Sequence, residues 1–106
     1  MMNKSYKIKY YRLVNSSTST AVLLSTALAS GVGTFFDKVM IQALQGNSDL
    51  VGVGDAPVMT SGSESGFILE KGASIHFDNV DLADLKLLPT VGGEGVMIGV
   101  YTVKTF

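Results

Sequence analysis

The sequence contains no cysteine and no tryptophan, and it has a single histidine, His76, among its 106 residues. Without cysteine the chain can form neither a disulfide scaffold nor a thiolate metal site. The cysteine content therefore gives no information on the redox compartment. The fold must be stabilised by packing alone.

Charged residues are also scarce. They make up 16% of the chain, whereas 46% of the residues are hydrophobic, a composition too apolar for a disordered protein. So little charge leaves neutral surface that neighbouring subunits could cover, and we expect oligomerisation or assembly. A chain of this length makes one domain. We expect an N-terminal basic arm or edge strand at residues 1–14 and a single β-sandwich domain at residues 15–106.

Half of the eight basic residues lie within the first twelve positions, and residues 13–36 carry no charge at all. Beyond Arg12, four lysines stand against nine carboxylates, a net charge of −5. Cations that alternate with Tyr6, Ile8 and Tyr10 fit an edge strand with solvated lysines better than a sequence-specific nucleic-acid site. Because aromatic residues and arginine are enriched at interfaces, we expect this segment to contact neighbouring subunits and to be dispensable for folding. The expected interface residues are Lys4, Tyr6, Lys7, Lys9, Tyr10, Tyr11 and Arg12.

Long hydrophobic runs are absent, since no stretch of 18 apolar residues occurs, and we expect no membrane span. The basic start followed by the apolar residues 21–24 and the sequence Ala27-Leu28-Ala29-Ser30 imitates a secretory signal. The polar run at 15–20 separates these two features, so we expect no signal. A secreted cellular β-domain cleaved after Ala29 remains the alternative. Residues 21–28 fit either a short helix or a strand, and we favour a strand.

From Phe35 onward, short segments rich in β-branched and aromatic residues alternate with turn residues. The segments are 38–44, 50–53, 74–77 and 96–103, and the turns are 46–48, 54–57, 61–63, 71–72 and 92–95. Turns roughly every ten residues are typical of sandwiches and barrels. The sequence therefore predicts an all-β fold, a compact antiparallel β-sandwich of jelly-roll-like type with an extended N-terminal arm.

Several segments are expected to form the core. Residues 35–44 have apolar side chains on both faces, with Phe35, Val39, Ile41 and Ala43 on one face and Phe36, Met40 and Leu44 on the other. This pattern predicts a central strand covered on both sides, the far side by loops or by a partner subunit. The leucines Leu82, Leu85, Leu87 and Leu88 form a further cluster. Gly99 predicts either a close backbone approach or a bulge in the last strand.

No residue pattern indicates catalysis. His76 lies between Ile75 and Phe77 without a nucleophile motif nearby, and we expect a surface or interface histidine. Asp78, Asp81 and Asp84 lack the spacing of a calcium loop and are expected to be solvated. The segment 52–54 matches a dinucleotide fingerprint over three residues only. We expect no catalytic residue, no metal, no cofactor and no enzymatic activity.

The order of motifs from residue 36 onward resembles small virion proteins of tailed bacteriophages. The resemblance covers about two thirds of the chain. It is carried by Gln42-Ala43 with Gly46-Asn47, by Val51-Gly52-Val53-Gly54-Asp55, by Leu69-Glu70-Lys71-Gly72 and by Asp81-Leu82 with Leu85. In place of the aromatic residue that usually follows the last motif, this chain has Lys86-Leu87.

The resemblance implies a β-sandwich and a role in the virion. We expect a capsid decoration or cement protein on the capsid surface, which stabilises the coat lattice by binding the major capsid protein or neighbouring virion proteins. A homo-oligomer, with a trimer favoured, is expected. The alternative is a tail, fibre or receptor-binding adaptor that binds a glycan through the loop at residues 60–66.

Overall fold

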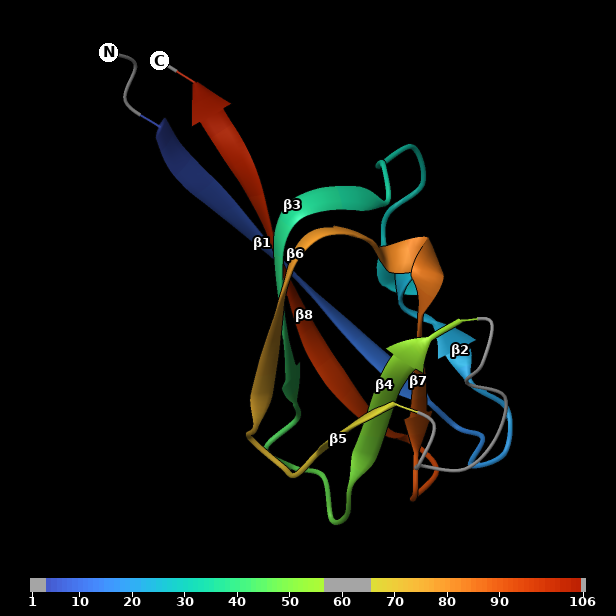
Figure 1. Cartoon of the computed structure of the whole chain (residues 1–106). Helices are drawn as coiled ribbons and strands as arrows, with labels where there is room; N and C mark the ends of the chain where they lie inside the picture. The colour runs from blue at the N-terminus through green and yellow to red at the C-terminus, as the bar shows by residue number, and fades with distance from the viewer. Residues whose placement is uncertain (1–3, 57–65, 106) are drawn as a thin grey trace.

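The computed structural model describes residues 4–56 and 66–105, with side chains described for residues 7–56 and 66–102. The predicted all-β fold is confirmed: eight strands form two antiparallel sheets, and the described residues contain no α-helix (Figure 1). The strands are β1 (Lys4–Asn15), β2 (Val22–Leu23), β3 (Phe35–Ala43), β4 (Val51–Asp55), β5 (Phe67–Leu69), β6 (Ser74–Asp81), β7 (Leu85–Pro89) and β8 (Glu94–Thr105). Two short 3-10 turns, η1 (Leu24–Ala27) and η2 (Leu82–Asp84), complete the fold.

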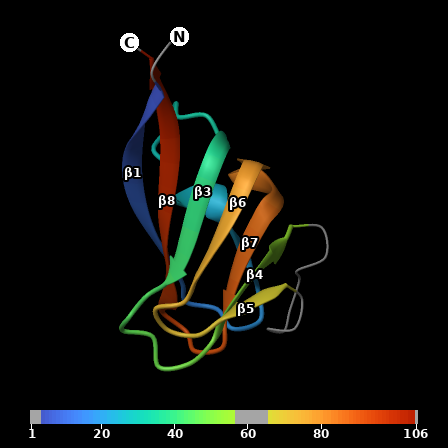
Figure 2. The ribbon, with the colours of Figure 1, turned by 60° about the vertical axis from the view of Figure 1, so that its left-hand side comes forward.

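The two sheets have a nested strand order. Sheet A has the order β1-β8-β3-β6, and sheet B has the order β2-β7-β4-β5 (Figure 2). Strand β1 pairs with β8, β2 with β7, β3 with β6, and β4 with β5, while β8 also pairs with β3 and β7 with β4. Each strand of the first half of the chain thus pairs with a strand of the second half, in reverse order, and these pairs are divided between the two sheets.

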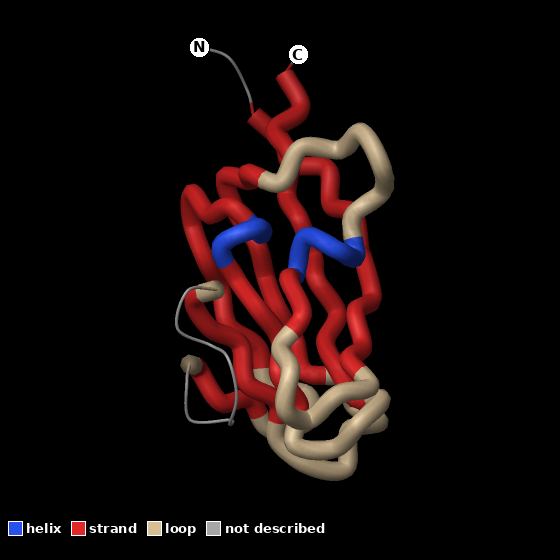
Figure 3. The backbone as a smooth tube through the Cα atoms, turned by 90° about the vertical axis from the view of Figure 1, so that its right-hand side faces the viewer, coloured by secondary structure: helices blue, strands red, loops and turns tan. Residues whose placement is uncertain are grey.

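The core lies between the sheets. Strand β8 shows how the sequence produces it, because Val96, Ile98 and Val100 alternate along the strand and all three are buried. The leucine cluster predicted to be buried is confirmed, with Leu82, Leu85, Leu87 and Leu88 each at most 8% exposed. Residues 21–28 are divided between β2 and η1, so that the strand prediction holds for two residues only. The 3-10 turns η1 and η2 lie side by side and each contributes one fully buried leucine, Leu24 and Leu82 (Figure 3).

The prediction that residues 35–44 are buried on both faces is wrong. Strand β3 changes its buried side part of the way along: Phe36 is buried and Phe35 is 60% exposed, whereas from Val39 onward the odd-numbered residues face the core. The change falls at two consecutive exposed residues, Asp37 and Lys38. Beside them in β6 lies Asn79, whose φ of 51° is in the left-handed region that asparagine tolerates. The change of buried side at Asp37 and Lys38 explains why strict alternation misassigned the two phenylalanines.

Strand β1 is an edge strand of sheet A, paired with β8 along all twelve of its residues. Leu13 and Asn15 at its C-terminal end are buried, and Tyr11 packs against the core. Toward their outer ends β1 and β8 continue together beyond the rest of the sandwich (Figures 1 and 2). This pairing argues against the expectation that the domain folds without residues 1–12.

Candidate functional site

The outward side of sheet A carries a group of exposed and half-buried apolar side chains, which we call the apolar platform. It consists of Ile8, Tyr10 and Val14 from β1, Met97 and Tyr101 from β8, and Met40 from β3. The strand register places these residues in adjacent rows, because Ile8 lies opposite Tyr101, and Tyr10 and Met40 both lie opposite Gly99. No described segment of the chain forms a third layer over this side of the sheet.

Tyr10 is the centre of the apolar platform. Its side chain is 64% exposed, although its ring lies against Gly99 of the neighbouring strand. A Cβ atom at Gly99 would lie 3.7 Å from Tyr10 Cε1, an ordinary contact distance, so the glycine provides a flat surface on which the ring rests. The close backbone approach or bulge predicted for Gly99 is wrong, because the nearest backbone atom to an added Cβ is Met40 O at 3.8 Å and the pairing of β8 with both neighbours is continuous. A large exposed aromatic ring, with methionines on the two neighbouring strands, has the composition of an interface core.

The structure divides the predicted interface residues into three groups. Tyr10 and Arg12 lie on the outward side of sheet A, while Lys7 and Lys9 are exposed on the opposite side of β1, the side that also carries Tyr11. Tyr11 itself is half-buried against the core rather than available to a neighbour. The side chains of Lys4 and Tyr6 lie outside the described residues, although both residues belong to β1.

Sequence reasoning missed several members of the platform. Met40 was assigned to a covered face, and Met97 and Val14 were not singled out, although both follow the period of two along their strands. The same alternation could have separated Tyr10 from Tyr11, because consecutive residues of a strand point to opposite sides of the sheet.

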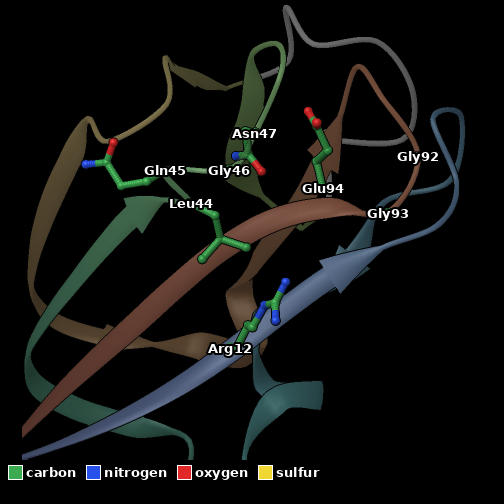
Figure 4. Close-up of a pocket in the computed structure, with 8 residues that line it drawn as sticks. All are labelled: Arg12, Leu44, Gln45, Gly46, Asn47, Gly92, Gly93 and Glu94. Atoms are coloured by element: carbon green, nitrogen blue, oxygen red, sulfur yellow. The ribbon is translucent and has the colours of Figure 1, made fainter.

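An open pocket of ≈ 430 Å³ lies at one end of the sandwich, next to the platform (Figure 4). Its lining comes from β1, from the β3–β4 connection and from the β7–β8 connection. The lining residues are Arg12, Leu44, Gln45, Gly46, Asn47, Gly92, Gly93 and Glu94. In Figure 4 the Arg12 side chain extends from β1 toward the loops that carry Asn47 and Glu94.

Two polar residues of this pocket hold the loops in place. The buried Asn47 side chain donates through Nδ2 to the Gly95 carbonyl oxygen (2.9 Å) and accepts through Oδ1 from the Gly95 N–H (3.3 Å). The Glu94 carboxylate accepts from the Ser48 N–H (2.6 Å) and hydroxyl (2.8 Å) and from the Asp49 N–H (3.3 Å). Chiefly because the Ser48 N–H bonds its ionised form, the pKa of Glu94 is lowered. Both residues therefore act first as clamps between β8 and the β3–β4 loop.

The residues considered for catalysis and metal binding have different roles in the structure. His76 is exposed on β6, as predicted for a surface histidine. Asp81 caps η2 by accepting from the Ala83 N–H (2.9 Å), and hydrogen bonds from the Thr34 side chain and from Ala83 lower its pKa. Asp81 is thus a structural cap, which the sequence reading as a solvated carboxylate missed. Over the part of the chain that the structure describes, no three potential metal-ligating side chains gather into a group.

One further segment considered from the sequence can be placed. Residues 52–54 are buried within strand β4 rather than forming a loop before a helix. The predicted glycan-binding loop at residues 60–66 falls outside the described residues except for Gly66. Within the described ranges, no helix has both the length and the hydropathy needed to cross a membrane.

No protein family, no curated protein and no solved structure matches the chain.

Proposed function

We propose that this chain is a non-enzymatic structural protein of a virus particle, a capsid decoration protein that binds coat subunits through the apolar platform of sheet A. The observation that carries the proposal is the exposed Tyr10 ring, held against Gly99 among half-buried methionines on an uncovered sheet. A coat subunit on this surface would cover Tyr10 together with the half-buried Met40 and Met97.

The strand order supports the virion assignment at the level of the fold. Eight strands in two sheets, paired in a nested way, are the arrangement expected of a jelly roll. Jelly rolls are common in viral capsid domains and also occur in lectins and cupins. Because one fold hosts many functions, this is an argument by analogy, and the platform rather than the fold has to carry the binding.

The mechanism of binding would be physical rather than chemical. A standard protein interface buries about 1,600 Å² in total, and about half of that lies on each partner. Many copies on a symmetric coat could each use a modest contact, because multivalent presentation raises avidity by about 10² to 10⁴-fold. A small platform centred on one tyrosine is consistent with binding of this kind.

The test has two parts. Quantitative mass spectrometry of purified source particles should count nearly one copy of this chain, or one oligomer, per repeating unit of the coat. Particles should then retain much less of the Tyr10→Ser variant than of the wild-type chain. The matched control is Phe67→Ser, which removes a similarly exposed aromatic ring from β5 of sheet B. The Phe67 ring packs edge-on against Phe77 of β6 in sheet A. Absence of the chain from particles, or equal retention of both variants, would contradict the proposal.

The second candidate function is a tail, fibre or receptor-binding adaptor. The pocket beside the platform favours it, since polar groups of Arg12 and Gln45 border an open space large enough for a saccharide unit. Only a few copies per particle would then be counted. Titration of the labelled protein with a panel of glycans should shift the amide resonances of Gly46 and Gly92, and shifts confined to other regions would argue against a ligand in this pocket.

A further inference from the structure

The four edges of the two sheets differ in how much regular strand they offer to another chain. Strand β2 has two residues, β5 has three, and the left-handed φ of Asn79 interrupts β6. Strand β1 has twelve residues, contains neither proline nor glycine, and pairs with β8 in one continuous register. An edge strand presents unpaired backbone N–H and C=O groups, which a further strand can bind. Of the described edges, β1 is therefore the one best suited to strand addition.

The two sides of the β1 edge differ in chemistry. Lys7 and Lys9 are exposed on the core side of sheet A, the side to which the buried Val100 of β8 also points. Ile8 and Tyr10 are exposed on the outward side, where they belong to the apolar platform. Successive residues of a strand point to opposite sides of the sheet, so the two kinds of side chain alternate along one edge. A strand added there meets two cations on one side and two apolar groups on the other.

The cations of this edge have no counter-charge among the described residues. Strand β1 contains four basic residues and no carboxylate. Neither the Lys7 nor the Lys9 side chain forms a hydrogen bond or an ion pair with any residue that the structure describes. Like charges directly opposite one another destabilise a strand pair, so these lysines disfavour the registers of a β1–β1 pair that bring them together. The same charges favour a partner strand that carries carboxylates, because charge can exclude one partner and select another.

From these observations we infer that the open edge of β1 binds an extended segment of a coat subunit in which carboxylate residues alternate with apolar residues. The carboxylates lie opposite Lys7 and Lys9, and the apolar side chains extend the platform beyond Ile8 and Tyr10. Backbone hydrogen bonds to β1 hold the added strand, and the alternation of its side chains supplies the specificity. The inference rests on the proposed function for the identity of the partner, and it adds a charged contact at the margin of the platform.

The probe is a synthetic peptide of six residues in which valine and glutamate alternate, with acetylated and amidated ends. Its alternation is the same in either direction, so the test does not depend on whether the added strand is parallel or antiparallel. In a titration of isotope-labelled full-length protein, the amide resonances of residues 7–12 should shift, while those of β2, β5 and β6 stay unchanged. A peptide in which valine and lysine alternate should bind roughly tenfold more weakly, because it opposes like charges to Lys7 and Lys9.

A charge reversal on β1 provides the decisive comparison. The double variant Lys7→Glu with Lys9→Glu should bind the lysine peptide more tightly than the glutamate peptide. The matched control is Lys71→Glu with Lys86→Glu, which changes the net charge equally in the turn before β6 and in β7. This control should keep the preference of the wild-type protein. A reversed preference in the control as well would overturn the inference, because binding would then follow net charge rather than the edge.

Three further outcomes would overturn the inference. They are equal binding of the two peptides by wild-type protein, the absence of shifts in β1 at millimolar peptide, and protection of the β1 amides from hydrogen exchange that grows with protein concentration without peptide. The last result would assign the edge to a second copy of the chain. Because the experiment uses no particles, its outcome is separate from the retention of the Tyr10→Ser variant, which tests the proposed function itself.

Discussion

At the scale of single residues, two glycines of β8 lie against the neighbouring strand β1. Gly99 provides the surface for Tyr10, and Gly95 allows β1 to approach closely. A Cβ atom at Gly95 would collide with the Leu13 carbonyl oxygen and would lie 2.8 Å from Val14 Cα. Both obstacles are backbone atoms, which cannot move aside as a flexible side chain can.

We predict that Gly95→Ala destabilises the protein by about 2 to 3 kcal/mol or more, because the added methyl group pushes β1 away from β8. Gly33→Ala is the matched control, since nothing lies within 4 Å of its Cβ position and its φ is not positive. Urea denaturation of both variants measures the difference. Equal midpoints for the two variants would show that β1 adjusts without cost.

A second prediction at this scale concerns pH. The pKa of Glu94 is lowered in the folded protein, chiefly by the Ser48 N–H, so the ionised carboxylate contributes stability that is present above its unfolded pKa. That stability is lost as the pH falls from about 5 through the lowered folded pKa. The free energy of unfolding, measured in urea at a series of pH values, should therefore decrease with acid in the wild-type protein.

The Glu94→Gln variant should lose part of this acid dependence, because glutamine cannot titrate. Glu70→Gln, a change at an exposed glutamate in the turn before β6, is the control and should leave the slope unaltered. An identical pH slope in wild-type and Glu94→Gln proteins would mean that the clamp between Glu94 and Ser48 does not form in solution. Asp81, whose pKa is also lowered, contributes with the same sign.

At the scale of elements, β1 has two roles. It is the only described neighbour of β8 on one side, and Tyr11 and Leu13 cover part of the core. On its outward side it supplies three of the six platform residues. A single strand thus contributes both to stability and to the proposed binding surface. Because truncation of β1 would change both, point substitutions are better probes of function.

We predict that deletion of residues 1–12 abolishes cooperative folding, because β8 would become an exposed edge and Tyr11 would be lost from the core. Loss of the dispersed amide spectrum in NMR and of the cooperative thermal transition would report this. Deletion of residues 1–3 alone is the control and should leave both signals intact. A truncated chain that still unfolds cooperatively as a monomer would restore the expectation of a dispensable arm.

At the scale of the whole molecule, the fold depends on contacts between distant parts of the chain. Lys4 pairs with Thr105 and Asn15 with Glu94, so the outermost strand pair joins the two ends of the described chain (Figure 1). Closing such a long loop costs entropy that no local contact repays early in folding. We therefore expect folding on a timescale of roughly milliseconds to seconds, as for other sandwiches.

Backbone cyclisation should relieve this cost. Because the two ends lie together in the β1–β8 pair, a short linker between them removes loop-closure entropy from the unfolded chain, and the chain-entropy model gives up to about 4 to 5 kcal/mol for a loop of roughly 100 residues. Urea denaturation of the cyclised protein, compared with a linear chain that carries the same linker residues, tests this. No gain in stability would imply that the ends of β1 and β8 are separated in solution.

Much of the fold could be predicted from local patterns. Alternation along 96–100 and the leucines of residues 82–88 were sufficient to identify core segments, because burial on one side of a strand leaves a period of two in the sequence. The same rule failed at Phe35 and Phe36, where β3 changes its buried side at the two exposed residues Asp37 and Lys38, beside the left-handed Asn79 of the paired strand. The period of two also places Tyr10 and Tyr11 on opposite sides of β1, although the sequence analysis assigned both residues to one interface.

The sequence by itself determined the all-β class, the alternation of strand segments with turns, and the basic character of the first strand, because these features depend on residue type and spacing along the chain. Only the tertiary structure decided that β1 closes the sandwich beside β8 and that Tyr10 joins Met40 and Met97 in one platform. These features depend on pairings between residues many positions apart, which leave no periodic signal in a single sequence.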